Sequence, residues 1–430
     1  MRTAFRRAAV LVGAGLLLAG PALAGCGKSD KTPQAASTEP VTLTINLFGD
    51  FGYKPLYDKY RQAHPNVTVK ENVTDYGTHH KNLQQHLVAG AGTADIEAIE
   101  IGQVAGYQGQ AAKFENFLEQ GVDKGRWTDQ KVRAASSPDG KVLFGVGTDI
   151  GGLALCYRSD LMKAAGIADT PDALAAKLKT WDDFVNVGKD FVAKTPNKGV
   201  KWFDAASNVF NAIIAQADKG MYDEGGKVIA DSNPAVKAAW DQTVAGVKAN
   251  ESAALAAFTP EWNTGFQKGG FATITCPSWM MAYIKDQAKD TAGKWNVVAI
   301  PGTGGGNWGG SYLTVPKQGK NKAAAIELAK WLTAPEQQAE LFKSKGNFPS
   351  DQNLWKTPDI TNFKDDFFGG AAVGKIFSES ALNLHYQPLG AHAGDIGNAF
   401  GNALVSIEQG KASPDDAWKK ALADIKNLTS

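Results

Sequence analysis

Aromatic and hydrogen-bonding side chains stand at the ends of several predicted strands in this chain of 430 residues. Trp279 follows the run 271–276, where the chain leaves a strand, and Trp308 lies in a glycine-rich loop at 302–310. A tryptophan among glycines has few neighbours to bury it, so we expect its ring to face a ligand. Asp50 ends the first predicted strand, and ligands of open α/β sheets bind beyond the carboxyl ends of strands. These residue types favour reversible binding through ring faces and hydrogen bonds.

Further candidate ligand-binding residues share a place in a predicted loop or at a strand end. They are Asp75, Tyr76, Glu100, Asp149, Trp262, Asn263, Tyr312 and Asp395. Structural alternatives stay open at this point. Trp279 could be a core tryptophan, Asp50 could simply form a turn, and the other carboxylates could be solvated charges.

Composition and motif spacing argue against several other chemistries. The formal net charge is only +1, so no strongly basic surface for nucleic acid is expected. His79, His80 and His86 lie close together, but no cysteine or carboxylate spacing accompanies them, so we predict a solvated helix face and no metal site. The glycine run at 302–310 lacks the Lys-Ser/Thr that follows in a phosphate-binding loop, and no cofactor is predicted.

The first 25 residues have the layout of an export signal, with an arginine-rich start, an apolar run at 8–18 and small residues before Cys26. The apolar run is shorter than the roughly 20 residues that a membrane span needs. The letters LAGC resemble the lipobox of bacterial lipoproteins, which implies cleavage of 1–25 and a lipid on Cys26 at the outer face of the membrane. An ordinary signal with a chance cysteine, or an uncleaved helix, is the alternative. Residues 26–40 are polar and read as a flexible tether.

Strands and helices alternate along the first half, which is typical of an α/β sheet. Period-two or apolar runs predict strands, and helical spacing predicts helices. The predicted strands are 41–47, 67–69, 94–101, 142–146, 153–157, 271–276 and 295–300. The predicted helices are 53–63, 77–89, 181–193, 234–249, 323–333 and 396–428, the last interrupted at 410–414. An apolar-periodic stretch at 202–221 lies between two of them.

The order of these segments resembles the extracellular carbohydrate-binding proteins of ABC importers, the maltose-binding-protein-like solute-binding family 1. The runs VTLTINLFGD, LALCYRSDLMKAAGI, FQKGGFATITCPSWMMAYI and APEQQAELF carry the likeness, which covers nearly the whole chain after Cys26. The family signature usually reads Tyr-Asn-Lys-Asp-Leu, and this chain departs from it at Arg158.

This resemblance implies a two-lobe α/β fold of the periplasmic-binding-protein type, type II-like, whose lobes close about hinge crossovers. The crossovers are expected at 147–149, 311–314 and 333–335. The first lobe would then comprise 41–147 plus 313–333, and the second lobe 148–312 plus 334–430.

The resemblance further implies an oligosaccharide ligand, permease subunits of an ABC importer as partners, contact with the membrane through the lipid anchor only, and a monomer without enzyme activity. Flat rings suit the C–H faces of a pyranose, while carboxylates and amides suit its hydroxyls. The runs GGGNWGGSYLTVPK and KGNFPSDQN resemble actinobacterial lipoproteins for cellobiose and related β-linked oligosaccharides.

Two other function classes remain open on the sequence. A secreted glycoside hydrolase could use paired carboxylates such as Glu100 and Asp149. A receptor for a non-sugar solute is the other alternative. With Cys26 lipidated, Cys156 and Cys276 are left in strand-like runs, and outside the cell they could form a disulfide or stay as buried free thiols.

Overall fold

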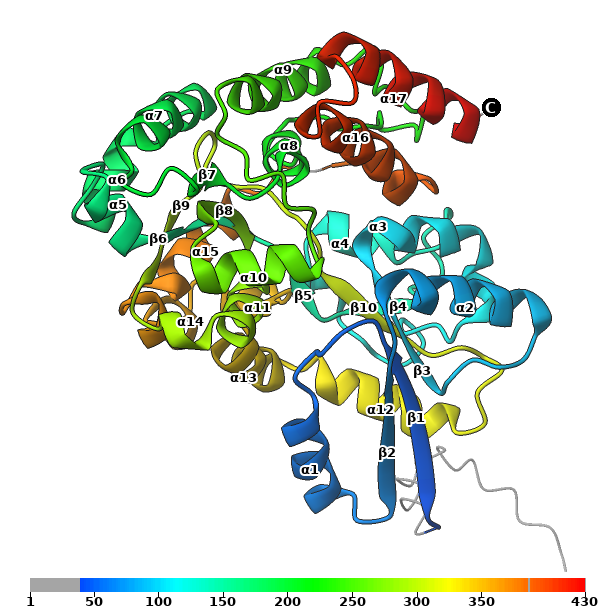
Figure 1. The fold of residues 1–430 in the computed structure, drawn as a ribbon. Helices are drawn as coiled ribbons and strands as arrows, with labels where there is room; N and C mark the ends of the chain where they lie inside the picture. Colours follow the sequence, from blue (N-terminus) through cyan, green and yellow to red (C-terminus); the bar gives the residue numbers. More distant parts are fainter. Residues whose placement is uncertain (1–38, 386, 430) are drawn as a thin grey trace, which may run out of the picture. The chain divides into compact units, whose positions relative to one another are not determined.

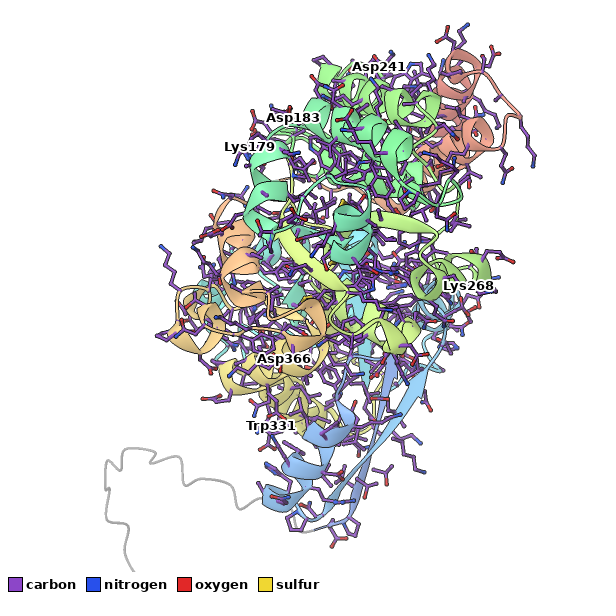
Figure 2. The ribbon with its side chains drawn as sticks, turned by 60° about the vertical axis from the view of Figure 1, so that its left-hand side comes forward. Lys179, Asp183, Asp241, Lys268, Trp331 and Asp366 are labelled. Carbon is purple, nitrogen blue, oxygen red and sulfur yellow. A yellow bond between two sulfur atoms is a disulfide. The ribbon has the colours of Figure 1, made fainter. Side chains whose placement is uncertain are left out.

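Two large sheets and a smaller two-stranded sheet organise the part of the chain that the computed structural model describes, residues 39–385 and 387–429. The predicted signal at 1–25 and the predicted lipid site at Cys26 lie outside these residues. Within the described ranges, every helix is too short or too polar to cross a membrane. Charged side chains such as Lys179, Asp241 and Lys268 point outward into solvent (Figure 2).

The first sheet has the strand order β2-β1-β3-β10-β4. Its strands are β1 (Val41–Leu47), β2 (Val67–Val73), β3 (Ile96–Glu100), β4 (Gly145–Gly147) and β10 (Ser311–Thr314). β1 pairs in parallel with β2 and β3, whereas β10 runs antiparallel between β3 and β4. A strand from late in the chain therefore completes a sheet made otherwise from its first third.

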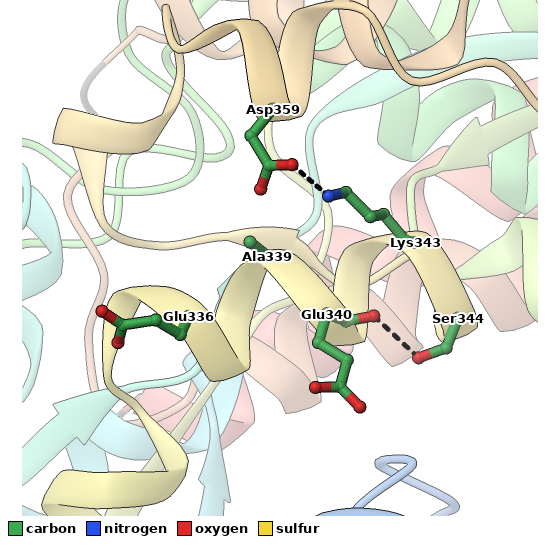
Figure 3. A pocket seen from close by; sticks show the side chains of 6 residues that line it. All are labelled: Glu336, Ala339, Glu340, Lys343, Ser344 and Asp359. Atoms are coloured by element: carbon green, nitrogen blue, oxygen red, sulfur yellow. Dashed lines mark hydrogen bonds and ion pairs between the residues drawn. The ribbon is translucent and has the colours of Figure 1, made fainter.

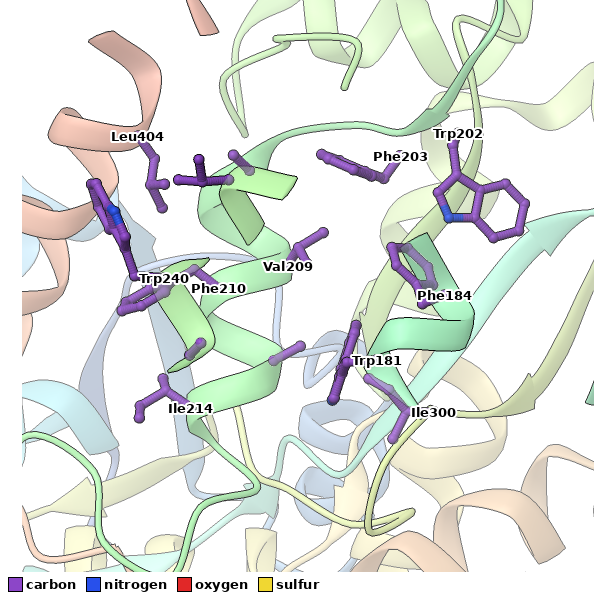
Figure 4. Packing of buried hydrophobic residues seen from close by; sticks show 14 of the residues in the cluster. Trp181, Phe184, Trp202, Phe203, Val209, Phe210, Ile214, Trp240, Ile300 and Leu404 are labelled. Carbon is purple, nitrogen blue, oxygen red and sulfur yellow. The ribbon is translucent and has the colours of Figure 1, made fainter. Parts of the chain in front are cut away.

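The second sheet has the order β7-β8-β6-β9 and is buried on both faces. Its strands are β6 (Leu153–Arg158), β7 (Lys201–Phe203), β8 (Phe271–Pro277) and β9 (Trp295–Ala299). Side chains alternate along a strand, so Leu153, Leu155 and Tyr157 enter one core while Ala154 and Cys156 enter another. Burial on both faces explains the nearly continuous apolar run of β6. Part of the first of these cores, with its tryptophan and phenylalanine rings, is shown in Figure 4.

The helices cover these sheets and begin mostly at side-chain caps or at proline (Figure 1). The longer ones are α1 (Lys54–Ala63), α2 (Tyr76–Ala89), α7 (Trp181–Lys194), α8 (Ala206–Ile214), α9 (Pro234–Lys248), α10 (Pro260–Lys268), α11 (Met280–Gln287), α12 (Lys322–Leu332), α13 (Pro335–Lys345), α15 (Val373–Leu382), α16 (Ala393–Glu408) and α17 (Pro414–Thr429). Shorter α-helices are α3 (Ile101–Val104), α4 (Asp129–Ala134), α5 (Ser159–Ala164), α6 (Pro171–Lys177) and α14 (Pro358–Thr361).

Three stretches of chain connect the two sheets. β4 belongs to the first sheet, while β5 (Asp149–Ile150) pairs with β11 (Phe348–Pro349) on the way to β6. The second connection runs from β9 of the second sheet to β10 of the first. The third lies between α12 and α13. Arg126 fastens the last connection, because its guanidinium donates to the carbonyl of Thr333 and to the Asp351 carboxylate, at 2.5 and 2.8 Å. The exact lobe boundaries expected from the sequence stay a prediction.

Most predicted elements appear within a few residues of their expected bounds. The stretch 202–221 is different, because it begins with the short strand β7 and only then forms α8. β7 has only three residues, which is too short for the alternation of apolar and polar side chains that marks a strand in a sequence. β4 also begins later than expected, at Gly145.

The disulfide between Cys156 and Cys276 links β6 to β8, with the two Cα atoms 5.5 Å apart. These strands pair antiparallel, with Ala154 opposite Cys276 and Cys156 opposite Ile274. The bond therefore joins two neighbouring strands of the second sheet whose cysteines are 120 residues apart in the sequence.

Candidate functional site

The segment 307–311, which leads from β9 into β10, contacts the candidate residues Trp279 and Asp149. The side-chain oxygen of Asn307 accepts a hydrogen bond from the Gly151 amide at 2.8 Å, and the Trp308 amide donates to the Gly151 carbonyl at 2.9 Å. Further on, the Gly310 carbonyl accepts from the Ile101 amide at 3.0 Å. The segment thus ties the start of β6 to the carboxyl end of β3.

Trp279 and Trp308 form an aromatic pair beside this segment. The Trp279 Nε1 donates to the Trp308 carbonyl at 3.0 Å, and the two rings meet edge-on with centroids 6.3 Å apart. Both side chains are only partly buried. Gly309, at φ +100°, lies so close that a Cβ there would come within 2.8 Å of Trp279 Nε1. Glycine is required at this position by both its backbone angle and the nearby indole.

Trp262 and Tyr312 lie in hydrophobic cores, which corrects their assignment as ligand contacts. Trp262 is 0% exposed, and its Nε1 donates to the buried Asp204 carboxylate at 2.8 Å. Tyr312 is 1% exposed, and its hydroxyl donates to the Lys131 carbonyl at 3.0 Å. The indole N–H of Trp262 and the hydroxyl of Tyr312 thus both bond to protein groups, and both rings pack in the core. Asn263, next to Trp262, is half-buried and accepts a hydrogen bond from the Tyr283 hydroxyl at 2.6 Å.

Asp149 is also buried, and its carboxylate holds the backbone of two crossovers together. One oxygen accepts from the Thr148 hydroxyl at 2.6 Å and from the Ser311 amide at 3.0 Å. The Lys131 ammonium group donates to the carbonyls of Asp149 and Ser311 at 2.8 and 3.0 Å and lies over the Tyr312 ring. The expected ligand contact of Asp149 is therefore replaced by a structural role.

Burial dominates the electrostatics of this Asp149–Lys131 pair. It raises the pKa of Asp149, which Lys131 and the hydrogen bonds counteract. It lowers the pKa of Lys131 to about 8, against the attraction of Asp149 and Glu100. Sequence reasoning misses Lys131, because a lysine on a short polar helix gives no sign that its ammonium group will be buried.

Glu100 and Tyr76 come together at the carboxyl end of β3. Glu100 caps α3, its Oε2 accepting from the Gly102 amide at 2.6 Å and from the Tyr76 hydroxyl at 3.1 Å. Gln103 donates to that same hydroxyl at 3.2 Å. Burial raises the pKa of Glu100 to about 7, although these hydrogen bonds and Lys131 lower it. Glu100 is partly exposed and Tyr76 is 41% exposed, so both can meet a ligand.

The two histidines of α2 correct the expectation of a solvated helix face, because His79 and His80 are 3% and 5% exposed. His80 holds Glu100 in place, since its Nε2 accepts from the Glu100 amide at 3.2 Å while its Nδ1 bonds the Tyr76 carbonyl at 2.9 Å. Burial lowers the pKa of His80 to about 4, so the ring is neutral at pH 7. In the described ranges 39–385 and 387–429, no three histidine, cysteine or acidic residues are grouped to hold a metal ion.

The three remaining aspartates are exposed and already have protein partners. Asp50 accepts from the Gly52 amide at 2.8 Å and pairs with Lys345 of α13 at 2.7 Å. Asp75 caps α2 by accepting from the Thr78 amide at 2.9 Å. Asp395 stands in the first turn of α16, 3.6 Å from His392. The first turn of α16 reaches α3, since a Cβ on Gly394 would lie 2.7 Å from the Gln103 amide nitrogen.

A shallow surface pocket of about 470 Å³ lies elsewhere, on α13 and α14 (Figure 3). Lys343 pairs with Asp359 across it, and Glu340 pairs with Lys59 of α1 at 2.5 Å. Its lining residues are Glu336, Ala339, Glu340, Lys343, Ser344 and Asp359, which include none of the predicted site residues. The pocket has no aromatic side chain to cover a ring-shaped ligand.

Comparisons with known proteins give the family and the fold of this chain. Residues 56–366 match the family described as bacterial extracellular solute-binding protein. The arabinooligosaccharide-binding protein of Bacillus subtilis (strain 168) is 27% identical, over 94% of this chain and 95% of its own length.

Solved structures show the same architecture. An extracellular solute-binding protein of family 1 is 40% identical, with a TM-score of 0.79 over 91% of this chain and 100% of the other. A binding protein from B. animalis subsp. lactis Bl-04 in complex with beta-1,6-galactobiose has a TM-score of 0.75 at 18% identity, over 91% and 97% of the two chains. The fold is thus the two-lobe α/β fold expected from the sequence, and the chain belongs to the bacterial extracellular solute-binding protein family.

Proposed function

We propose that this protein is the receptor of an ABC importer and captures an oligosaccharide outside the cell. The observation that carries the proposal is the aromatic pair of Trp279 and Trp308, held beside the crossover segment 307–311. Two partly exposed indoles can cover the apolar faces of sugar rings. The nearby carboxylate of Glu100 and hydroxyl of Tyr76 can hydrogen-bond to sugar hydroxyls.

Among oligosaccharides we propose cellobiose or a related β-linked chain, on the strength of the sequence resemblance. The relative from Bacillus subtilis is named for arabinooligosaccharides, which makes these the principal competing ligands. Hinge closure would bury the sugar between the lobes and present a closed surface to the permease subunits. Asp50, Asp75, Asn263 and Asp395 remain proposed contacts that such closure would bring to the ligand.

Burial of Asp149 weakens the alternative of a glycoside hydrolase. A hydrolase needs two carboxyl groups that both reach the scissile bond. Glu100 is partly exposed, but Asp149 is 8% exposed and its carboxylate is bonded to Thr148 and Ser311. We therefore propose that the protein binds its sugar and releases it chemically unchanged.

The test is calorimetric titration of the purified protein with cello-, arabino-, xylo- and galacto-oligosaccharides, with chromatography of the sugars afterwards. One-to-one binding of one linkage class without cleavage is the expected result. Cleavage would favour the hydrolase, and no binding across the panel would favour a non-sugar solute.

The proposed location is the outer face of the cell membrane, with the protein held as a monomer by a lipid on Cys26. Expression of the full chain should give a membrane-bound product whose mass includes a lipid on that cysteine. Cys26→Ala should release the protein or leave its signal uncleaved. Unchanged membrane attachment of a cleaved Cys26→Ala variant would contradict the anchor.

A further inference from the structure

Phe258 is an aromatic ring that the structure leaves in solvent. Its side chain is 57% exposed, and within residues 39–385 and 387–429 it is the one phenylalanine or tryptophan among the large exposed hydrophobic side chains. It lies just before α10, in the loop that follows α9. Leaving a large apolar side chain this exposed costs hydrophobic free energy, which binding of a ligand to the ring would recover.

The backbone of this loop is strained, because three of its non-glycine residues have positive φ angles. Asn250, Ala254 and Phe258 have φ values of 60°, 54° and 66°. In the described part of the chain, these are the non-glycine residues in the left-handed region, and all three fall within nine positions. A bulky residue with positive φ is unusual, and such strain gathers at binding and active sites.

Hydrogen bonds along the edge of β7 fix the loop in this conformation. The Glu251 carbonyl accepts from the Trp202 amide at 2.8 Å, and the Ala253 amide donates to the Phe203 carbonyl at 2.9 Å. The Leu255 amide then donates to the Asp204 carbonyl at 3.1 Å. The loop is thus fixed up to Leu255, and the Thr259 hydroxyl fixes its far end by donating to the Ala256 carbonyl at 2.8 Å. A backbone fixed on both sides of Phe258 lowers the entropy cost of binding to its ring.

The orientation of the ring matches that of Trp279. The two rings are within 20° of parallel, with centroids 6.4 Å apart, while Tyr283 meets Phe258 edge-on at 5.6 Å. The Tyr283 hydroxyl and the Asn263 amide lie beside this surface, joined by a hydrogen bond of 2.6 Å. Flat faces with polar groups at their edge are the chemistry that suits a sugar ring.

Packing at the start of α10 does not explain the exposure of Phe258. A hydrophobic residue just before an N-cap often packs against the fourth helical residue and fixes the entry of the chain. Here Thr259 is the N-cap of α10, and the fourth helical residue is Asn263, which is polar. The ring centroids of Phe258 and Trp262 lie 5.2 Å apart, yet Phe258 remains 57% exposed.

We propose that Phe258 is an outer binding platform that takes an additional sugar unit of an oligosaccharide whose inner unit occupies Trp279. This inference rests on the proposed sugar-receptor function and adds the preferred ligand length. The ligand that gains from Phe258 is an oligosaccharide long enough to extend past Trp279 towards α10.

The test compares chain lengths by calorimetric titration of the full chain. The probes are cello-oligosaccharides and arabino-oligosaccharides from the disaccharide to the tetrasaccharide. Phe258→Ala should weaken binding of the longer members by about three- to tenfold and leave the shortest bound member unchanged, since an aromatic contact of this kind has that strength. Phe258→Leu keeps apolar bulk without a flat face and should show the same loss.

Two further variants separate binding from folding. Phe258→Gly relieves the positive φ, so it should unfold at the same or a higher temperature and still lose the length preference. Leu382→Ala changes another exposed apolar side chain, on α15, and should leave every affinity unchanged.

An equal loss for all lengths would overturn the platform, because Phe258 would then act by supporting Trp279. Unchanged affinities in all three Phe258 variants would overturn it as well. If the unaltered chain binds no member of either series, the proposed ligand class fails and the platform fails with it; that result is distinct from a variant that binds without preference for length.

Discussion

At the residue scale, four tryptophans show how burial decides the role of a ring. Trp202 and Trp262 are 0% exposed and fill cores, whereas Trp279 and Trp308 stay partly exposed beside the crossover segment. The difference comes from their neighbours. Trp308 is followed by two glycines with positive φ, which supply no side chains to cover it. Trp262 instead lies in the first turn of an amphipathic helix whose apolar face turns inward.

We predict that Trp279→Ala weakens oligosaccharide binding by about 2–4 kcal/mol, the range for a central aromatic contact. Thermal unfolding should change little, because the ring is only partly buried. Calorimetric titration measures the affinity, and Trp279→Phe, which keeps a flat face, should retain most of it. Loss of folding with intact residual affinity would instead assign the ring to the core.

Glu100 makes a prediction about pH. Its pKa of about 7 means that it gains charge between roughly pH 6 and 8. A charged carboxylate accepts stronger hydrogen bonds from hydroxyls than a neutral one. Sugar affinity should therefore rise with pH across this window.

Affinity measured at pH 6, 7 and 8 checks this expectation. Glu100→Gln should abolish the dependence, whereas Glu261→Gln on the exposed start of α10 should retain it. A dependence that survives in Glu100→Gln would place the titrating group elsewhere.

At the element scale, the sequence predicts the strands and helices well and their side-chain contacts poorly. The apolar runs of β1, β6 and β8 are unambiguous, and proline or capping residues mark most helix starts. Burial of Asp149 and Tyr312 could not be predicted from local pattern. It arises because β10 inserts between β3 and β4, which places residues distant in sequence around the same point.

α4 supports a prediction about the crossovers. Lys131→Met removes the ammonium group from the Asp149 and Ser311 carbonyls and leaves a buried carboxylate without its cation. We expect a loss of about 1–3 kcal/mol in the free energy of unfolding, because two buried carbonyl groups lose their charged hydrogen-bond donor. Urea unfolding followed by tryptophan fluorescence measures it.

A double-mutant cycle identifies the partner. Lys131→Met combined with Asp149→Asn should cost less than the sum of the single changes, because the two groups interact. Lys163→Met on the exposed face of α5 should stay within about 0.5 kcal/mol of the unaltered protein. Strict additivity at Lys131 and Asp149 would show that the pair is not coupled.

The disulfide between Cys156 of β6 and Cys276 of β8 should stabilise the folded protein. Replacing Cys156 and Cys276 together by alanine frees a loop of 120 residues in the unfolded chain. The free energy of unfolding should fall by roughly 2–5 kcal/mol. Denaturant unfolding of the double variant provides the measurement, and an unchanged midpoint would contradict it.

At the scale of the whole molecule, buried carboxyl groups couple stability to pH. Burial raises the pKa of Glu97 and Asp204 to about 7 and that of Glu251 to about 8. Glu251 is 0% exposed, and neither of its carboxyl oxygens has a hydrogen-bond partner. The folded state therefore holds these protons more tightly than the unfolded state does.

The sign of the effect follows from this difference. For Glu251, the stabilising contribution is complete below its ordinary pKa of 4.5 and is lost as pH rises to about 8. Each such proton contributes a slope of up to about 1.4 kcal/mol per pH unit. We predict that Glu251→Gln narrows the difference in unfolding temperature between pH 5 and pH 9.

Differential scanning calorimetry at the two pH values measures that difference. Glu261→Gln, which alters an exposed carboxylate, should leave it as in the unaltered protein. An equal difference in the Glu251 variant would mean that this carboxyl group is not a source of the pH dependence.

The place of β10 in the first sheet affects the order in which the chain can fold as it is made. β3 and β4 emerge early, but the strand that joins them ends at Thr314. The strands of the second sheet are all synthesised once Ala299 is made. The second sheet can therefore be completed before the first, although its strands start later in the sequence. Until β10 arrives, one edge of β3 lacks its neighbour, and such open edges invite association with other chains. A nascent chain released before residue 314 should therefore aggregate, whereas the complete chain closes this edge with β10.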